Sequence, residues 1–108
     1  MRQELIEAVK KTQAEELQEA NKSFAAFNSR HEGYAVILEE AQEAEIELRQ
    51  MANNLNGLWE LTKQNAPKED IEMLAEGLEQ SAVLLAAEAI QTAAMARKLL
   101  DFISSKEA

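Results

Sequence analysis

The residues of this chain that could carry chemistry are carboxylates, repeated at helical spacing in the segment LEEAQEAEIE (38–47). At 3.6 residues per turn, Glu40, Glu43 and Glu47 share one edge of a helix. Glu39 precedes Glu43 by one turn. Like charges stacked in this way destabilise a helix slightly unless cations neutralise them, and divalent cations such as Mg²⁺ prefer oxygen ligands. The segment therefore predicts either a solvated acidic face or one half of a metal site.

A second candidate is Glu88, the only charged residue in the apolar stretch AVLLAAEAIQTAAMA (82–96), in which Gln91 is the only amide. A helix that is apolar on nearly all sides is expected to be buried on most of them. A buried carboxylate is costly unless it is protonated or paired with a cation. Two interpretations stay open: Glu88 pairs with a Lys or Arg of a neighbouring helix, or it joins Glu40 and Glu43 around one or two Mg²⁺ ions.

Three helices are expected to position these residues. The pattern breaks in two places. Turn-forming residues gather at FNSRHEG (27–33), and a proline ends the segment QNAP (64–67). Between the breaks, apolar residues recur at spacings of three and four. The first helix is predicted from about Arg2 to Ala26. The second is predicted from near Glu32 to the second break, and the third from near Pro67 to the end of the chain.

The second helix carries two further local features. Ser29 and Glu32 have the spacing of a capping box, in which the first residue caps the helix and the second bonds back. Gly57 lies inside the apolar pattern and weakens the helix, so it permits a bend or break near Asn53–Gly57.

The fold class that follows is all-α: a bundle of three long helices forming a single domain over residues 1–108. Helices of this length would be ~40–55 Å long, which exceeds the diameter of a compact monomer of this size. Long helices with near-continuous apolar stripes also resemble packing seams. We therefore expect oligomerisation, as a homodimer or tetramer, to complete the bundle.

Composition excludes several functions. Twenty acidic residues against eleven basic ones give a formal charge of −9, which disfavours nucleic acid as a partner. No apolar run approaches the ~20 residues of a membrane span, and the charged start MRQELIEAVKKTQ is unlike a signal peptide, so we expect a cytoplasmic protein with no membrane partner. The chain has no cysteine, which excludes thiolate sites, and its one histidine excludes a multi-histidine zinc site on a single chain. That histidine lies outside the helical clusters, which disfavours a di-iron bundle built on Glu-x-x-His pairs.

Two segments, FNSRHEGYAVILEE (27–40) and EAIQTAAMAR (88–97), resemble the MazG-like branch of the all-α nucleoside triphosphate pyrophosphohydrolases. The likeness covers roughly residues 2–103. The metal signature of that superfamily is EExxE on one helix and ExxD on a later one. Glu39, Glu40 and Glu43 match the first part, and Glu88 matches the start of the second. Gln91 occupies the Asp position, where an amide oxygen can ligate weakly but brings no negative charge.

The resemblance implies cleavage of a nucleoside triphosphate, ribo or deoxy, to the monophosphate and pyrophosphate, with Mg²⁺ or alternatively Mn²⁺. The metal ligands it implies are Glu40, Glu43, Glu88 and Gln91. Glu39 is the implied base for the attacking water, or a group that hydrogen-bonds to the ligands. Arg97 or Lys98 would contact phosphate, although either is equally explained as a solvated charge at a helix end.

Other residues have a structural explanation beside a functional one. His31 could act as a base or ligand, but a residue in this place is more often a turn or capping residue. Trp59 and the methionines Met51, Met73 and Met95 fall near the apolar stripes and are expected to fill the core rather than to stack on a base. The alternative function for the whole chain is a helical interaction or regulatory protein that keeps this fold without the chemistry.

Overall fold

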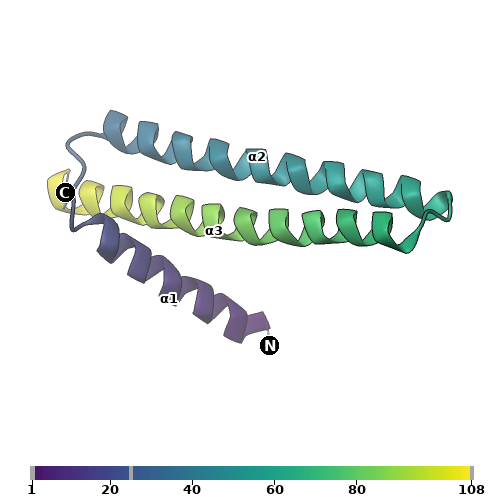
Figure 1. Cartoon of the computed structure of the whole chain (residues 1–108). Helices are drawn as coiled ribbons and strands as arrows, with labels where there is room; N and C mark the ends of the chain where they lie inside the picture. Colours follow the sequence, from purple (N-terminus) through teal and green to yellow (C-terminus); the bar gives the residue numbers. More distant parts are fainter. Residues whose placement is uncertain (1, 25, 108) are drawn as a thin grey trace. The chain divides into compact units, whose positions relative to one another are not determined.

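The computed structural model describes residues 2–24 and 26–107 and contains three α-helices (Figure 1). These are α1 (Arg2–Ala20), α2 (Arg30–Lys63) and α3 (Lys68–Lys106). Helix accounts for 88% of the described residues, and none of these residues lies in a strand. The all-α prediction is therefore confirmed.

Helix α1 ends at Ala20, and the prediction that it continues to Ala26 is wrong. The amide of Lys22 donates to the carbonyl of Glu19 at 3.2 Å, a contact one residue shorter than an α-helical bond. This tightening occurs where the polar residues NKS (21–23) follow, and such residues have weak helix propensity. The apolar spacing nevertheless continues to Phe27, beyond the end of the helix. Phe27 packs into the core from the connecting segment and is only 5% exposed.

The start of α2 is capped as predicted. The amide of Glu32 donates to Oγ of Ser29 at 3.1 Å, so Ser29 is the N-cap and the helix begins at Arg30. The Glu32 carboxylate does not bond back to Ser29. It accepts from the backbone amide and the side-chain Nδ2 of Asn28, at 3.2 and 3.1 Å. The capping box is thus extended by one residue, and it fixes the segment that enters α2.

Helix α2 is continuous through Gly57, so the break that the sequence permits near Asn53–Gly57 does not occur. A Cβ atom at Gly57 would lie 3.0 Å from Cδ1 of Leu74, on α3. The glycine therefore faces the flexible end of the Leu74 side chain, and α2 stays helical there despite the low helix propensity of glycine.

Two compact units make up the chain, and each has its own packing. The first consists of Met1–Ala41 with Glu88–Ala108, and the second of Gln42–Ala87. In the first unit, α1, the start of α2 and the end of α3 share a core. Its buried members are Phe27, Ala94, Met95 and Phe102, surrounded by Leu17, Ala20, Val36, Ile37, Leu99 and Ile103. In the second unit, α2 and α3 form an antiparallel hairpin (Figure 1).

Many large apolar side chains lie at the surface. The expectation that the stretch 82–96 is buried on most sides is wrong for its first turns, since Val83 is 63% and Leu84 42% exposed. The expected core role is likewise wrong for Trp59 and Met73, which are 59% and 67% exposed, and it is confirmed for Met95. Within the described residues, none of the helices has a segment apolar enough over sufficient length to cross a bilayer.

Candidate metal centre

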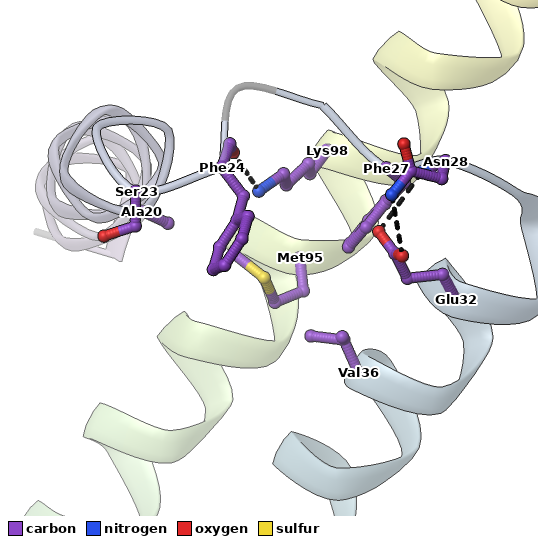
Figure 2. Close-up of a pocket in the computed structure, with 9 residues that line it drawn as sticks. All are labelled: Ala20, Ser23, Phe24, Phe27, Asn28, Glu32, Val36, Met95 and Lys98. Atoms are coloured by element: carbon purple, nitrogen blue, oxygen red, sulfur yellow. Dashed lines mark hydrogen bonds between the residues drawn. The ribbon is translucent and has the colours of Figure 1, made fainter.

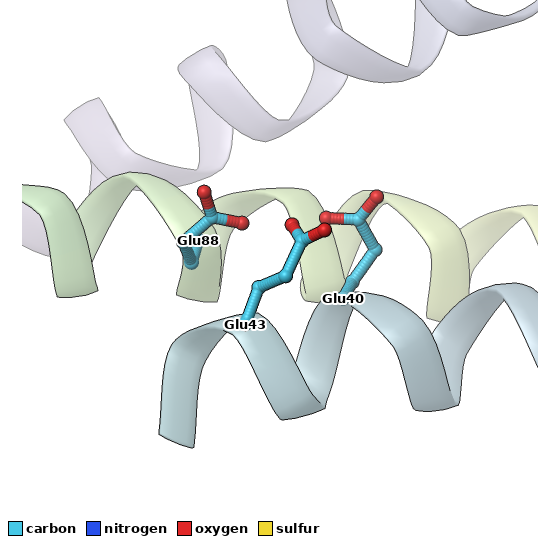
Figure 3. Close-up of side chains that lie close together, drawn as sticks. All are labelled: Glu40, Glu43 and Glu88. Carbon is cyan, nitrogen blue, oxygen red and sulfur yellow. The ribbon is translucent and has the colours of Figure 1, made fainter. Parts of the chain in front are cut away.

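Three glutamates of the described residues form an acidic cluster (Figure 3). Glu40, Glu43 and Glu88 each present a carboxylate oxygen, and these oxygens all lie within 4.8 Å of one another. Glu40 and Glu88 are half-buried, and Glu43 is exposed. The structure thus brings together three of the four residues predicted as metal ligands; we call this set the acidic triad.

The geometry of the triad follows from helix periodicity. Glu40 and Glu43 are three residues apart on the uninterrupted helix α2, so their side chains leave neighbouring points on one edge. Glu88 belongs to α3 and to the same compact unit as Glu40. Figure 3 shows the three carboxyl groups turned toward the same space.

The donor set of the triad suits a hard divalent cation. Carboxylate oxygens are the preferred ligands of Mg²⁺, Mn²⁺ and Ca²⁺, and Mg²⁺ in particular is commonly held by a few carboxylates plus water and substrate phosphate. Two unit charges ~4 Å apart repel by about 1 kcal/mol in bulk water, and by more where water is partly excluded. A divalent cation at the triad would turn this repulsion into attraction.

Glu39 and Gln91 lie outside the triad. Glu39 is exposed and, as the neighbour of Glu40, projects about 100° away from it around α2. Its predicted role as base stays a prediction. Gln91 lies one turn beyond Glu88 on α3, and its Nε2 donates to Oε2 of Glu16 at 2.6 Å.

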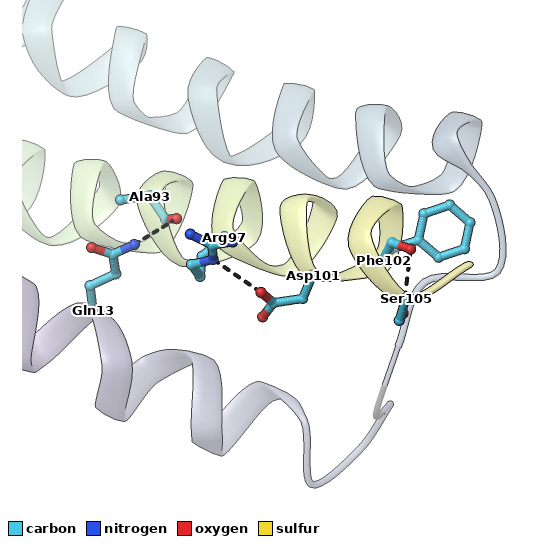
Figure 4. Close-up of polar contacts among 6 residues, drawn as sticks. All are labelled: Gln13, Ala93, Arg97, Asp101, Phe102 and Ser105. Atoms are coloured by element: carbon cyan, nitrogen blue, oxygen red, sulfur yellow. Dashed lines mark hydrogen bonds and ion pairs between the residues drawn. The ribbon is translucent and has the colours of Figure 1, made fainter. Parts of the chain in front are cut away.

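Glu16 is the residue near the site that sequence reasoning missed. It lies on α1 and is half-buried. A weak signal was present: Gln13, Glu16, Leu17 and Ala20 follow each other at spacings that place them on one face of a helix. This face docks on α3, because Nε2 of Gln13 donates to the carbonyl oxygen of Ala93 at 3.1 Å (Figure 4).

The two basic residues predicted to contact phosphate have different environments. Nε of Arg97, an exposed residue, donates to Oδ1 of Asp101 at 3.1 Å (Figure 4). Lys98 is only 6% exposed, and its Nζ donates to the carbonyl oxygen of Phe24 at 2.6 Å (Figure 2). Their phosphate role stays a prediction. His31 is an exposed residue in the first turn of α2, and it precedes Glu40, the first triad residue, by nine positions.

A pocket of about 460 Å³ opens in the same compact unit (Figure 2). Its walls are mainly apolar and include a few polar residues: Ala20, Ser23, Phe24, Phe27, Asn28, Glu32, Val36, Met95 and Lys98. Val36 precedes Glu40 by four residues on α2, and Met95 follows Glu88 by seven on α3. The pocket and the triad therefore use successive turns of the same two helices.

One ion pair beside the first unit's core shows a shifted pKa. Arg30 contacts Glu107 through Nε, at 2.8 Å from Oε2, and through Nη2, at 2.5 Å from Oε1. The hydrogen bond from Arg30 lowers the pKa of Glu107 below its usual value of 4.5, and the same bond raises the pKa of Arg30. This two-point contact ties the start of α2 to the residue after α3.

We compared the chain with models of known protein families, with curated proteins and with solved structures, and none of the three comparisons gave a match. The interpretation of the site therefore depends on its residues and their geometry.

Proposed function

We propose that this chain is a Mg²⁺-dependent nucleoside triphosphate pyrophosphohydrolase of the MazG-like type, which cleaves a nucleoside triphosphate to the monophosphate and pyrophosphate. The single observation that carries the proposal is the acidic triad, in which two helices supply carboxylate oxygens within 4.8 Å of one another. The residues of the triad are three of those that the family signature assigns to the metal, and Glu88 lies far in sequence from Glu40 and Glu43.

Glu40, Glu43 and Glu88 would hold the cation, with Mn²⁺ as a substitute for Mg²⁺. When bound, the cation supplies charge neutralisation for the triphosphate oxygens and lowers the pKa of a coordinated water. The carboxylates keep the cation at a fixed position against the helices. Glu39 is the proposed base, since a carboxylate beside the ligands can accept the proton of the attacking water.

The pocket beside the triad gives room for the rest of the substrate. Its volume of about 460 Å³ is within the range of small-molecule sites. The rings of Phe24 and Phe27 and the thioether of Met95 offer apolar surface for a base, and the hydrogen-bonded pair Asn28 and Glu32 adds polar groups to the lining. We propose that the nucleoside binds in this pocket while the triphosphate extends to the triad.

We also propose that the working form is a homodimer or tetramer. The support comes from exposed apolar side chains such as Trp59, Met73 and Val83, which are unusual in such number on a monomer that acts alone. A second copy of the chain would cover them.

The test is a pyrophosphate-release screen over ribo- and deoxyribonucleoside triphosphates with Mg²⁺ or Mn²⁺. The inactive reference is Glu43→Ala. The matched control is Glu47→Ala, since Glu47 follows on the same edge of α2 but lies outside the triad. Metal-dependent release by the wild type and Glu47→Ala, absent in Glu43→Ala, supports the proposal. No release by the wild type with any substrate contradicts it.

A second candidate function is a helical interaction protein that keeps the fold without turnover. Two observations favour it: the family's Asp is replaced by Gln91, and large apolar side chains lie exposed along the helices. This candidate predicts a stable complex with a partner protein and no effect of Mg²⁺ on the unfolding temperature. The screen and a metal titration therefore separate the two functions.

A further inference from the structure

The contact between Gln91 and Glu16 assigns a role to a residue that the family signature does not include. Nε2 of Gln91, on α3, donates to Oε2 of Glu16, on α1, at 2.6 Å. Both side chains are half-buried, and the two residues are 75 positions apart in sequence. A short hydrogen bond to a carboxylate is among the stronger polar contacts in proteins.

This contact fixes which way the amide of Gln91 faces. An amide group has one end that only donates, the NH₂, and one that only accepts, the carbonyl oxygen. If the amide were reversed, Oε1 would face the Glu16 carboxylate, and two acceptors at this distance repel. Glu16 therefore holds the NH₂ end, and Oε1 is the atom that Gln91 keeps for other contacts.

Only the oxygen of an amide can ligate a hard cation or accept a bond from its coordinated water. Gln91 lies one turn from Glu88, at the position where the signature has its second acidic residue. We propose that Glu16 is a positioning residue of the metal site: it orients Gln91 so that Oε1 is offered to the cation held by the triad, directly or through a water. This inference rests on the proposed function.

The same contact gives a physical reason for glutamine at this position. An aspartate at position 91 would place a second carboxylate near Glu16, and like charges would repel. With glutamine at position 91, α3 lacks the carboxylate that the signature places there, and the nearby carboxylate is that of Glu16 on α1. A carboxylate is therefore present beside residue 91, one turn from Glu88 on α3, despite the departure from the signature.

A purely structural role for Glu16 is the competing explanation, because the contact also ties α1 to α3. Gln13 provides the matched control. It makes a second α1–α3 contact, from Nε2 to the carbonyl oxygen of Ala93 at 3.1 Å, and Ala93 is not a predicted site residue. Gln13→Ala loosens the docking of α1 without touching Gln91. Glu15→Gln is the charge control, since Glu15 is an exposed neighbour on the same helix.

The experiment is a calorimetric titration of Mn²⁺ into the full chain, with the thermal unfolding midpoint of each variant recorded alongside. Loss of a group that orients a metal ligand costs about 10–100-fold in affinity. We expect Glu16→Ala to weaken Mn²⁺ binding about tenfold or more. Glu16→Gln should have a smaller effect, because an amide can face Gln91 with either end. Gln13→Ala and Glu15→Gln should stay within about twofold of the wild type.

Equal weakening by Glu16→Ala and Gln13→Ala would show that Glu16 serves only to dock α1, and wild-type affinity in Glu16→Ala would likewise overturn the inference. In both cases the proposed function survives if the wild type binds Mn²⁺ and releases pyrophosphate. No Mn²⁺ binding by the wild type would overturn the proposed function, and the role of Glu16 with it.

Discussion

The ammonium group of Lys98 donates a 2.6 Å hydrogen bond to the carbonyl oxygen of Phe24 and lies 5.0 Å from the ring centre of Phe27. Lys98 is thus a buried cation that holds the segment between α1 and α2 against the end of α3. Two kinds of contact retain it there, a charge-assisted hydrogen bond and a cation–π interaction.

The substitution Lys98→Met tests whether these two contacts of Lys98 stabilise the fold. Methionine fills similar volume but leaves the Phe24 carbonyl without its donor, and a hydrogen bond to a charged group contributes about 1.5–3 kcal/mol. We expect a loss of that order in the free energy of unfolding, measured with urea. The control is Arg97→Met, which removes an exposed pair with Asp101 and should cost less than about 0.5 kcal/mol. Equal stability of Lys98→Met and the wild type would contradict the role of Lys98.

Gly33→Ala should destabilise the first unit. A Cβ atom at Gly33 would lie 2.9 Å from Cδ1 of Leu99 and 3.2 Å from Cδ2 of Phe27, closer than side chains normally approach. Both neighbours belong to the core or pack against it, so repacking is costly. Overpacking of this kind costs about 1–3 kcal/mol, which outweighs the gain of ~1 kcal/mol in helix propensity. Chemical denaturation checks this, and increased stability would contradict the packing.

Gly57→Ala should have the opposite sign. Its Cβ would meet one methyl group of Leu74, Cδ1 at 3.0 Å, which is the flexible end of a half-buried side chain. A small rotation of Leu74 removes the contact, so the helix-propensity gain of up to ~1 kcal/mol should prevail. We expect the unfolding midpoint of Gly57→Ala to equal or exceed that of the wild type. A clear decrease would show that this part of α2 requires closer packing than Leu74 alone indicates.

Glu107→Gln tests the pH dependence of the pair with Arg30. The hydrogen bond from Arg30 lowers the pKa of Glu107, so the unfolded chain binds its proton more readily than the folded chain. The pair therefore stabilises the fold above the usual glutamate pKa of 4.5, and this contribution is lost as the pH falls through the lower, folded value. The midpoint of the wild type should exceed that of Glu107→Gln at pH 7, and the gap should close in acid. A gap that is constant down to pH 2 would contradict the shift.

Local features of the sequence predicted much of this fold. The three helices, the Ser29 cap and the shared edge of Glu40 and Glu43 depend on residues a few positions apart, and helical periodicity specifies such relationships. The placement of Glu88 beside them was one of the two interpretations that its apolar setting left open, and the resemblance to the MazG-like family favoured it.

The remaining features depend on contacts between distant segments. Periodicity along α1 placed Leu17 and Ala20 on the face that packs against the core, but it did not show that Glu16, beside them, meets Gln91. The early end of α1 was missed because Phe27 continues the apolar spacing from a non-helical segment. The exposure of Val83 was missed because an apolar side chain does not reveal whether its neighbour is another part of the chain or a second copy.

The most direct test of the central claim is a calorimetric titration of Mg²⁺ into the wild type, Glu40→Gln and Glu88→Gln, with Glu47→Gln as the control outside the triad. We expect saturable binding to the wild type and to Glu47→Gln, and at least about tenfold weaker binding to the two triad variants, because each loses a charged ligand. Absence of binding to the wild type, or equal binding by all four proteins, would contradict a metal site at Glu40, Glu43 and Glu88.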